Sequence, residues 1–344
     1  MRPRCPDRAS VTCDACGHIA ERELDEAQHP AVARLPDADA LGSSLALWSF
    51  LSKLGFNTTF ISPTDYGDFL KWMPGEEQIV NFEDNKPLAA DMVKEADFVF
   101  CLDFNALKRI NELGPIVEKS SAVKVLVDHH QEPEDFAEYG LWTTKTSSTC
   151  ELIYDMIRMW KGDTAIDKAI ASCIYAGMMT DTGSFRFDSV TPNTHLVAAD
   201  LISKGVENAL IHNLIYDSYS LNRMRFVGHV LANKLEVIPE LNVAIITITK
   251  QELEKYQVRT GDTEGLVNFG LSIRGMELAA LFVDRTVLVK ISFRGKGKFP
   301  ANRLAKDHFD GGGHYSAAGG QSKETLEQTV ERFKKVIKEY KEYL

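Results

Sequence analysis

Acidic and imidazole side chains follow two apolar runs of this chain, at points where a buried strand would end. The run Val125–Val127 stops at Asp128, His129 and His130, and an earlier run stops at Asp103. Two adjacent imidazoles and a carboxylate can bind a transition metal and still keep one side chain for proton transfer. A polar loop with two chance histidines is the alternative interpretation, and further acidic positions weigh against it.

Three more aspartates could join these groups. Asp37 and Asp39 are two residues apart, so an extended or turned backbone could aim both at one site, although an ordinary helix N-cap is the alternative. Asp181 lies beside a Thr-Gly pair, where a simple turn residue is the alternative. Carboxylates gathered in one cleft repel one another unless cations neutralise them. We therefore expect divalent ions, and Mn²⁺ or Mg²⁺ fits carboxylates combined with an imidazole.

A carboxylate that bridges two ions would create a two-metal centre. In such a centre the ions lie about 3.5–4 Å apart and clamp the attacking and leaving oxygens of a phosphoryl transfer. Asp103 follows a strand that we expect near the middle of the sheet, which makes it the candidate bridge.

Alternating strands and helices must position these side chains. The expected strands span residues 57–61, 97–103 and 123–127, and the expected helices span residues 43–54, 87–95 and 106–113. This rhythm predicts right-handed crossovers and a parallel sheet, whose ligands bind outside the carboxyl ends of the strands. Asp103 and Asp128 should therefore lie at the ligand-binding edge. A first strand is only weakly indicated, by Ala31–Ala33.

Helices are expected to follow the Asp-His-His segment. Ser148 and Glu151 have the spacing of a capping box, which predicts a helix from there to Trp160. A further apolar helix at 164–178 leads into Asp181.

The pattern changes near residue 239, where short alternating strands replace the earlier rhythm. We therefore predict an α/β protein, with a parallel-sheet, Rossmann-like N-terminal domain and a smaller α+β C-terminal domain. The expected divisions are an atypical N-terminal segment at 1–34, the metal-binding domain at 35–215, a connector helix at 216–238 and the second domain at 239–344.

The charge of the chain limits the kinds of ligand that it is expected to bind. The 344 residues carry a net charge of −10, which argues against broad binding to long nucleic acid. The stretch from Arg285 to Lys306 nevertheless contains seven basic residues and no acidic one. Such a patch suits a small phosphorylated ligand, with a solvated surface as the alternative.

The expected location and the absence of a zinc site follow from segments that the sequence lacks. No apolar run could span a bilayer and no signal-peptide core begins the chain, so we expect a cytoplasmic location. Cys13 and Cys16, with Cys5 and His18 nearby, make at most half a zinc site, and we expect no metal there.

Taken together, the motifs resemble the DHH phosphoesterase superfamily. The matching segments are Pro36-Asp37-Ala38-Asp39-Ala40, Leu102-Asp103-Phe104, Asp128-His129-His130, Thr180-Asp181-Thr182-Gly183 and Gly311-Gly312-Gly313-His314. Within the superfamily the chain is most similar to the nanoRNase A group, which combines oligoribonuclease and 3′-phosphoadenosine 5′-phosphate phosphatase activities. The resemblance covers roughly residues 36–320, with the motifs in family order.

The resemblance implies a role for each matching residue. The implied metal ligands are Asp37 and Asp103 for one ion, and Asp39, Asp103, His129 and Asp181 for the other. Asp128 would orient the histidines, and His130 would face the scissile phosphate as general acid or phosphate contact. The implied substrate-phosphate residues are Arg294, Gly312, Gly313 and His314.

The resemblance also implies the reaction. A hydroxide that bridges two divalent ions, Mn²⁺ in the first place and Mg²⁺ as the alternative, would attack in line. The substrates would be short oligoribonucleotides, cut to 5′-mononucleotides, and 3′-phosphoadenosine 5′-phosphate, held between two domains by a terminal phosphate. We expect no long duplex and no membrane as partner, and the sequence leaves open whether the chain forms a homodimer.

One departure from the family pattern affects the first metal site. The family places a histidine ligand three residues before the Pro-Asp pair, and here that position is Ala33. A catalytically impaired nucleotide-binding homologue is therefore one alternative. A phosphodiesterase for cyclic or linear dinucleotides is the other, and a pyrophosphatase or a RecJ-type exonuclease is less expected.

Overall fold

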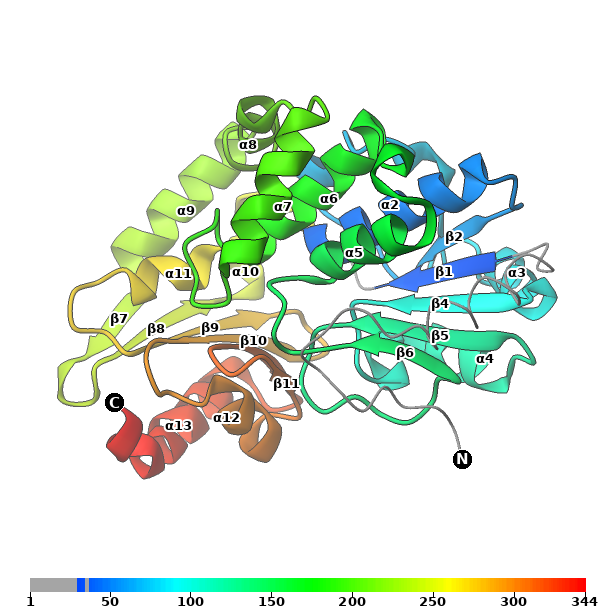
Figure 1. The fold of residues 1–344 in the computed structure, drawn as a ribbon. Coiled ribbons are helices and arrows are strands. Elements are labelled where there is room, and N and C mark those ends of the chain that lie inside the picture. Colours follow the sequence, from blue (N-terminus) through cyan, green and yellow to red (C-terminus); the bar gives the residue numbers. More distant parts are fainter. Residues whose placement is uncertain (1–29, 35–36) are drawn as a thin grey trace. The chain divides into compact units, whose positions relative to one another are not determined.

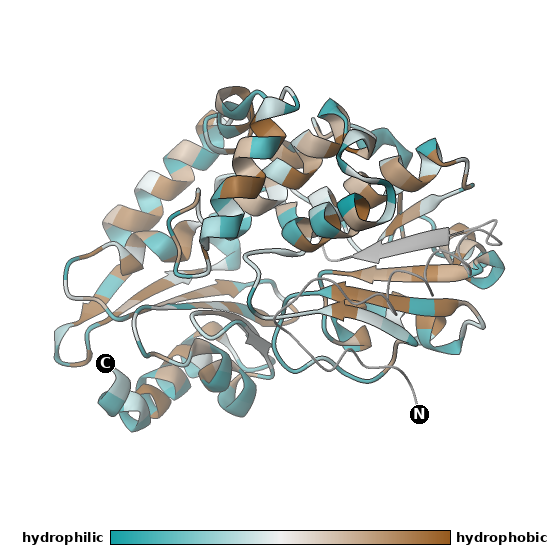
Figure 2. Ribbon diagram, viewed as in Figure 1, coloured by the Kyte–Doolittle hydropathy of each residue, from teal (hydrophilic) through white to brown (hydrophobic). Residues whose placement is uncertain are grey.

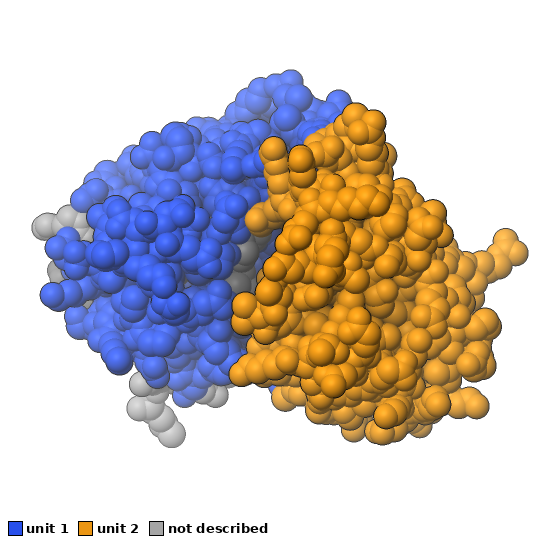
Figure 3. Space-filling view, turned by 180° about the vertical axis from the view of Figure 1, so that it is seen from behind, with its two compact units in different colours: residues 1–218 blue, residues 219–344 orange. Residues whose placement is uncertain are grey.

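The computed structural model describes residues 30–34 and 37–344. The chain divides into two compact units between Ser218 and Tyr219, coloured separately in Figure 3. Each unit has its own sheet and its own apolar cores. Cys5, Cys13, Cys16 and His18, which we expected not to bind metal, lie outside the described residues. No helix among the described residues is both long and apolar enough to cross a membrane.

The first unit contains a six-stranded parallel sheet with the order β3-β2-β1-β4-β5-β6. Its strands are β1 (Pro30–Arg34), β2 (Thr59–Ser62), β3 (Ile79–Asn81), β4 (Phe98–Leu102), β5 (Val123–Asp128) and β6 (Tyr139–Trp142). The chain runs outward in one direction from β1 and in the other direction from β4. The switch between these directions lies between β1 and β4, the place where open α/β sheets bind ligands.

Helices cover both faces of this sheet (Figure 1). The helices are α2 (Ala38–Lys53), α5 (Thr149–Lys161), α6 (Lys168–Asp181), α7 (Pro192–Ser203) and α8 (Asn208–Tyr216) on one face, and α3 (Lys86–Glu95) and α4 (Gly114–Lys119) on the other. Successive residues of β4 alternate between the two layers: Phe98 and Phe100 pack with α2 and α6, whereas Val99 and Cys101 pack with α3 and α4. The predicted Rossmann-like class is thus confirmed.

The second unit contains a mixed sheet with the order β11-β12-β10-β9-β8-β7, in which only β8 and β9 are parallel. Its strands are β7 (Leu235–Ile238), β8 (Val243–Ile248), β9 (Leu278–Asp284), β10 (Val289–Gly295), β11 (Gly312–Gly313) and β12 (Ala317–Ser322). Its helices are α9 (Leu221–Asn233), α10 (Lys250–Lys255), α11 (Leu266–Leu271), α12 (Ala301–His308) and α13 (Leu326–Val336). Strands β8 and β9 are strongly apolar because both faces are covered, one by α12 and α13 and the other by α9 and α11 (Figure 2).

Some local expectations differ from the structure. The expected helix at 106–113 is a 3₁₀ segment, Leu107–Leu113, interrupted by the left-handed Asn111 (φ +52°). A domain start at residue 35 leaves out β1, which lies in the middle of the first sheet. A connector at 216–238 includes both α9 and β7, which belong to the second unit.

Candidate metal centre

Asp37 and Asp39 lie at the start of α2, immediately after the central strand β1. Asp37 is the N-cap residue, and its Oδ1 accepts a hydrogen bond from the Ala40 amide at 2.9 Å. The N-cap interpretation is therefore confirmed for Asp37, and its role as a metal ligand stays a prediction. Asp39 lies within the first turn of the helix and is buried.

Asp103 is the first residue after β4 and adopts a left-handed backbone conformation (φ +63°). Its amide donates to the carbonyl of Val127 at 3.0 Å, which ties the end of β4 to β5. Few residues other than glycine adopt this conformation, and aspartate is among those that tolerate it best. Backbone strain of this kind is typical of functional sites.

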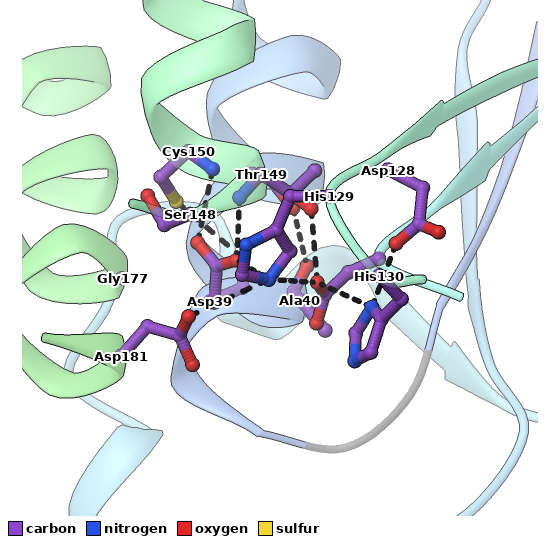
Figure 4. Close-up of polar contacts among 12 residues, drawn as sticks. Asp39, Ala40, Asp128, His129, His130, Ser148, Thr149, Cys150, Gly177 and Asp181 are labelled. Atoms are coloured by element: carbon purple, nitrogen blue, oxygen red, sulfur yellow. Dashed lines mark hydrogen bonds and ion pairs between the residues drawn. The ribbon is translucent and has the colours of Figure 1, made fainter. Parts of the chain in front are cut away.

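His129 brings three of the predicted ligands together. Its Nε2 lies 3.7 Å from Asp39 Oδ2 and 3.4 Å from Asp181 Oδ2 (Figure 4). The same nitrogen lies 3.5 Å from Asp103 Oδ1. The helix that we expected to end at residue 178 continues to Asp181, which is the last residue of α6. Four side chains, from α2, from α6 and from the ends of β4 and β5, thus converge on one point.

His130 is oriented by Asp128. Its Nδ1–H donates to Asp128 Oδ1 at 2.7 Å, and the same nitrogen lies 3.8 Å from Asp103 Oδ1. Asp128 is fully buried at the end of β5, and its Oδ2 accepts no hydrogen bond within the described part of the chain. This hydrogen bond fixes the plane of the His130 ring. It also places the ring proton on Nδ1, the nitrogen that faces Asp128.

The electrostatics of the cluster favour a cation. Burial raises the pKa of Asp103 well above its usual value, and the carboxylates of Asp37, Asp39, Asp181 and Asp128 raise it further. Burial also raises the pKa of Asp39, against the opposing effect of His129. Without positive charge, these aspartates would resist ionisation, so a bound cation would stabilise their charged form.

The donor atoms fit a divalent metal ion. Asp39, His129 and Asp181 each offer one ligand atom, and these atoms lie within 4.8 Å of one another; Asp103, Asp128 and His130 form a second such group. Oxygen donors with one or two imidazoles suit Mn²⁺ and Mg²⁺.

The sequence reasoning missed three residues that contact the cluster from helices. The amides of Thr149 and Cys150, at the start of α5, donate to Asp39, and Gly177 of α6 faces the same carboxylate. The capping pattern around Ser148 did locate this helix start, and Ser148 Oγ accepts from the Glu151 amide as expected. The Glu151 carboxylate does not complete the expected capping box, because it accepts from the amide of Ser147 instead.

The predicted substrate residues lie close together within the second unit. Arg294 of β10 is opposite Ala317, and Ala317 exchanges backbone hydrogen bonds with His314. Gly312 and Gly313 form the edge strand β11. At Gly313 (φ +142°) a Cβ atom would lie 2.6 Å from the Ala317 carbonyl oxygen, so only glycine fits there. Substrate binding by these residues stays a prediction.

Known proteins and protein families are similar to this chain. Residues 32–178 match the DHH family, N-terminal domain, and residues 240–343 match the DHHA1 domain. A bifunctional oligoribonuclease and PAP phosphatase NrnA from Thermus thermophilus is 29% identical over 88% of this chain and 87% of its own. The corresponding NrnA of Bacillus subtilis is 32% identical over 58% of this chain and 63% of its own.

Solved structures are similar as well. The crystal structure of an exopolyphosphatase-related protein from Bacteroides fragilis is 39% identical and superposes with a TM-score of 0.90, covering 96% of this chain and 98% of that one. RecJ from Thermus thermophilus, solved with Mn²⁺, shares the fold at 12% identity and a TM-score of 0.55, over 96% of this chain and 54% of RecJ.

Proposed function

Because this chain belongs to the DHH family of phosphoesterases, we propose that it uses divalent metal ions to hydrolyse short oligoribonucleotides to 5′-mononucleotides and to remove the 3′-phosphate of 3′-phosphoadenosine 5′-phosphate. The main support is the convergence of three carboxylates on His129 Nε2, within 3.4–3.7 Å. The similarity to two NrnA proteins supports the choice of substrates.

The protein's own residues would hold and orient the reacting groups. Asp39, Asp103, His129 and Asp181 would ligate the ions, with Asp37 as a further ligand. Bound divalent ions would neutralise charge and make a water molecule a better nucleophile. Mn²⁺ is our first choice, because carboxylates and imidazole are combined in one donor set.

His130 would act on the substrate through Nε2, the nitrogen opposite the one that Asp128 holds. Burial, with a contribution from Arg109, lowers the pKa of His130 to about 3, so the ring is neutral near pH 7 in the absence of substrate. A substrate phosphate beside the ring would favour its protonation, which a general acid or a phosphate contact requires.

The second unit would supply phosphate recognition. The guanidinium of Arg294 can form two parallel hydrogen bonds with a phosphate, and the backbone amides of Gly312 and Gly313 can approach it closely. His314 would add a further donor. Recognition of a terminal phosphate by these groups would explain a preference for very short substrates.

The test is hydrolysis by the purified full-length protein in the presence of Mn²⁺. We expect 5′-mononucleotides from an RNA dinucleotide, AMP and phosphate from 3′-phosphoadenosine 5′-phosphate, and slower cleavage of a longer RNA. Intact dinucleotide and intact phosphoadenosine phosphate would refute the proposal. Faster cleavage of a cyclic dinucleotide than of either substrate would favour the dinucleotide phosphodiesterase alternative.

A further inference from the structure

The first turn of α5 contacts two of the proposed metal ligands, Asp39 (Figure 4) and Asp103. The Thr149 amide donates to Asp39 Oδ2 at 2.7 Å, and the Cys150 amide donates to Asp39 Oδ1 at 2.9 Å. The Thr149 hydroxyl donates to Asp103 Oδ1 at 2.9 Å. All four residues are buried, so water does not compete for these hydrogen bonds.

These contacts suit carboxylates that must remain ionised and also bind a metal. An ionised carboxylate offers about four acceptor positions, so one amide on each oxygen of Asp39 leaves room for an ion. Hydrogen bonds from Cys150 lower the pKa of Asp39, against the larger effect of burial. The partial positive charge at the start of a helix favours the same ionised form.

Gly177 of α6 also lies close to the Asp39 carboxylate. A Cβ atom at Gly177 would lie 2.3 Å from Cys150 Sγ and 3.0 Å from Asp39 Oδ1. Only a residue without a side chain lets α6 approach the first turns of α2 and α5 this closely. The backbone of α6 therefore lies close to the Asp39 carboxylate, which α5 holds by its two amides.

A second buried carboxylate anchors the start of α5 itself. Glu151 accepts hydrogen bonds from the Ser147 amide at 3.1 Å, from Asn193 Nδ2 at 2.8 Å and from Thr194 Oγ1 at 3.2 Å. Asn193 and Thr194 belong to the first turn of α7. This network fixes the segment before α5 against α7. Glu151 would therefore influence the proposed metal ligands through the position of α5.

We propose that Thr149 is a positioning residue for the metal centre, which orients Asp39 through its amide and Asp103 through its hydroxyl, and that Glu151 holds it in place. This inference rests on the proposed metal-dependent function. Residues that orient metal ligands typically change metal affinity by about 10–100-fold when they are altered. The hydroxyl of Thr149 can be removed with little change in side-chain size, by T149V.

The test is Mn²⁺ binding to the full-length protein by isothermal titration calorimetry, without nucleotide. We expect T149V to bind Mn²⁺ at least about tenfold more weakly, and T149S, which keeps the hydroxyl, to bind within about threefold of wild type. The matched control is T146V, because the Thr146 hydroxyl lies in the same segment and donates to the Ser148 carbonyl rather than to a proposed ligand. We expect T146V to bind Mn²⁺ as wild type does.

A second variant keeps the test independent of the folding of T149V. E151Q removes the negative charge that strengthens the hydrogen bonds from Ser147 and Thr194, so the start of α5 should be held less firmly and Mn²⁺ affinity should fall by about threefold or more. Wild-type affinity in T149V, or equal losses in T149V and T149S, would overturn the role of the hydroxyl. Wild-type affinity in E151Q would overturn the anchoring role.

The outcomes also separate this inference from the proposed function. A chain that shows the Thr149 pattern in Mn²⁺ binding but leaves nucleotides intact refutes the proposed function alone. A chain that hydrolyses nucleotides while T149V binds Mn²⁺ normally refutes the inference alone. Absence of Mn²⁺ binding in the wild-type protein refutes both.

Discussion

Asp103 combines three properties that are each unfavourable in a folded chain. It is buried, its backbone is left-handed, and four other carboxylates raise its pKa. Asparagine or glycine would tolerate the same backbone conformation without burying a charge. An aspartate is therefore not expected at this position in an ordinary loop. Its presence supports the proposal that this cluster binds a cation.

Replacing the Asp103 carboxylate should therefore have opposite effects on stability and on function. We expect D103N to raise the melting temperature of the metal-free protein, because an unfavourable buried carboxylate is lost while Asn still fits the backbone. The affinity for Mn²⁺ and the rate of hydrolysis should each fall by about 100-fold or more, so Mn²⁺ should stabilise the variant less than the wild type. Thermal unfolding in EDTA and in Mn²⁺, together with a hydrolysis assay, measures these effects.

Asp91 provides the control, because it is exposed on α3. D91N should change neither the metal-free melting temperature nor the response to Mn²⁺. A lower metal-free melting temperature in D103N would show that Asp103 is a structural residue.

Position 33 offers a gain-of-function test. Ala33 pairs with Cys101 of β4, two residues before Asp103, so it lies at the carboxyl end of the central strand. We expect A33H to add an imidazole ligand and to raise Mn²⁺ affinity by about tenfold or more, with faster hydrolysis. Titration calorimetry and a dinucleotide assay measure the two effects; unchanged binding would show that position 33 contributes no ligand.

Helix α6 approaches the proposed metal ligand Asp39 closely at Gly177, and this close approach reverses the usual effect of glycine in a helix. Alanine normally stabilises an exposed helix position by about 1 kcal/mol over glycine. At Gly177 the added methyl would collide with Cys150 and Asp39. We expect G177A to destabilise the protein by about 2 kcal/mol, as overpacking does, and to weaken Mn²⁺ binding.

Gly228 of α9 is the matched control, since a Cβ atom added there would meet nothing within 4 Å. G228A should stabilise the second unit by about 1 kcal/mol and leave Mn²⁺ binding unchanged. Denaturant unfolding measures the change in the free energy of unfolding of each variant. A stabilising effect of G177A would contradict the close packing around Asp39.

A carboxylate between α9 and α10 makes the stability of the second unit depend on pH. Burial raises the pKa of Glu252, but hydrogen bonds from His229, Thr249 and Lys234 outweigh it and lower the pKa to about 2. A depressed pKa stabilises the folded state above the ordinary value of 4.5, and this contribution is lost as the pH falls toward 2.

The corresponding variant is E252Q. We expect it to destabilise the protein by about 2 kcal/mol at pH 7 and progressively less below pH 4.5, as followed by circular dichroism during urea unfolding. E254Q, on the exposed side of the same helix, should have little effect at either pH. A difference between E252Q and wild type that persists in full at pH 2 would contradict the assigned pKa.

Strand ends were predictable from the sequence, and contacts between helices were not. Asp103 and Asp128 follow apolar runs, and the carboxyl ends of parallel strands meet at one edge, so their convergence could be inferred. Asp181 belongs to the end of a helix, whose direction depends on the packing of α6 against α2. The amides of Thr149 and Cys150 carry no residue-type signal, because every residue except proline has the same N–H group.

Short edge strands were also beyond the sequence pattern. Strand β3 has only three residues, and β6 contains Gly140, so neither shows a clear alternation. Both are recognisable only through pairing with longer neighbours, β2 and β5. The central strand β1 was weakly indicated for a similar reason, since alanine at two of its five positions lowers its apolar character.

At the scale of the whole molecule, the tryptophans allow one unit to be observed separately. All four tryptophans, at positions 48, 72, 142 and 160, belong to the first unit. We expect Mn²⁺ to raise the unfolding midpoint followed by tryptophan fluorescence by several degrees, because it binds only the folded metal centre. EDTA should reverse the shift. A fluorescence midpoint that does not respond to Mn²⁺ would contradict a metal centre in this unit.

The order of the strands in the first sheet has a consequence for how the protein matures. Asp39 and Asp181 are separated by 142 positions, and Asp103 follows a strand on the other side of the topological switch. No short fragment, nor either half of the sheet alone, therefore contains the complete set of proposed ligands. Contacts between residues distant in sequence slow folding, so the proposed site would be complete only once this whole unit has folded, and Mn²⁺ uptake would report that the unit had been completed correctly.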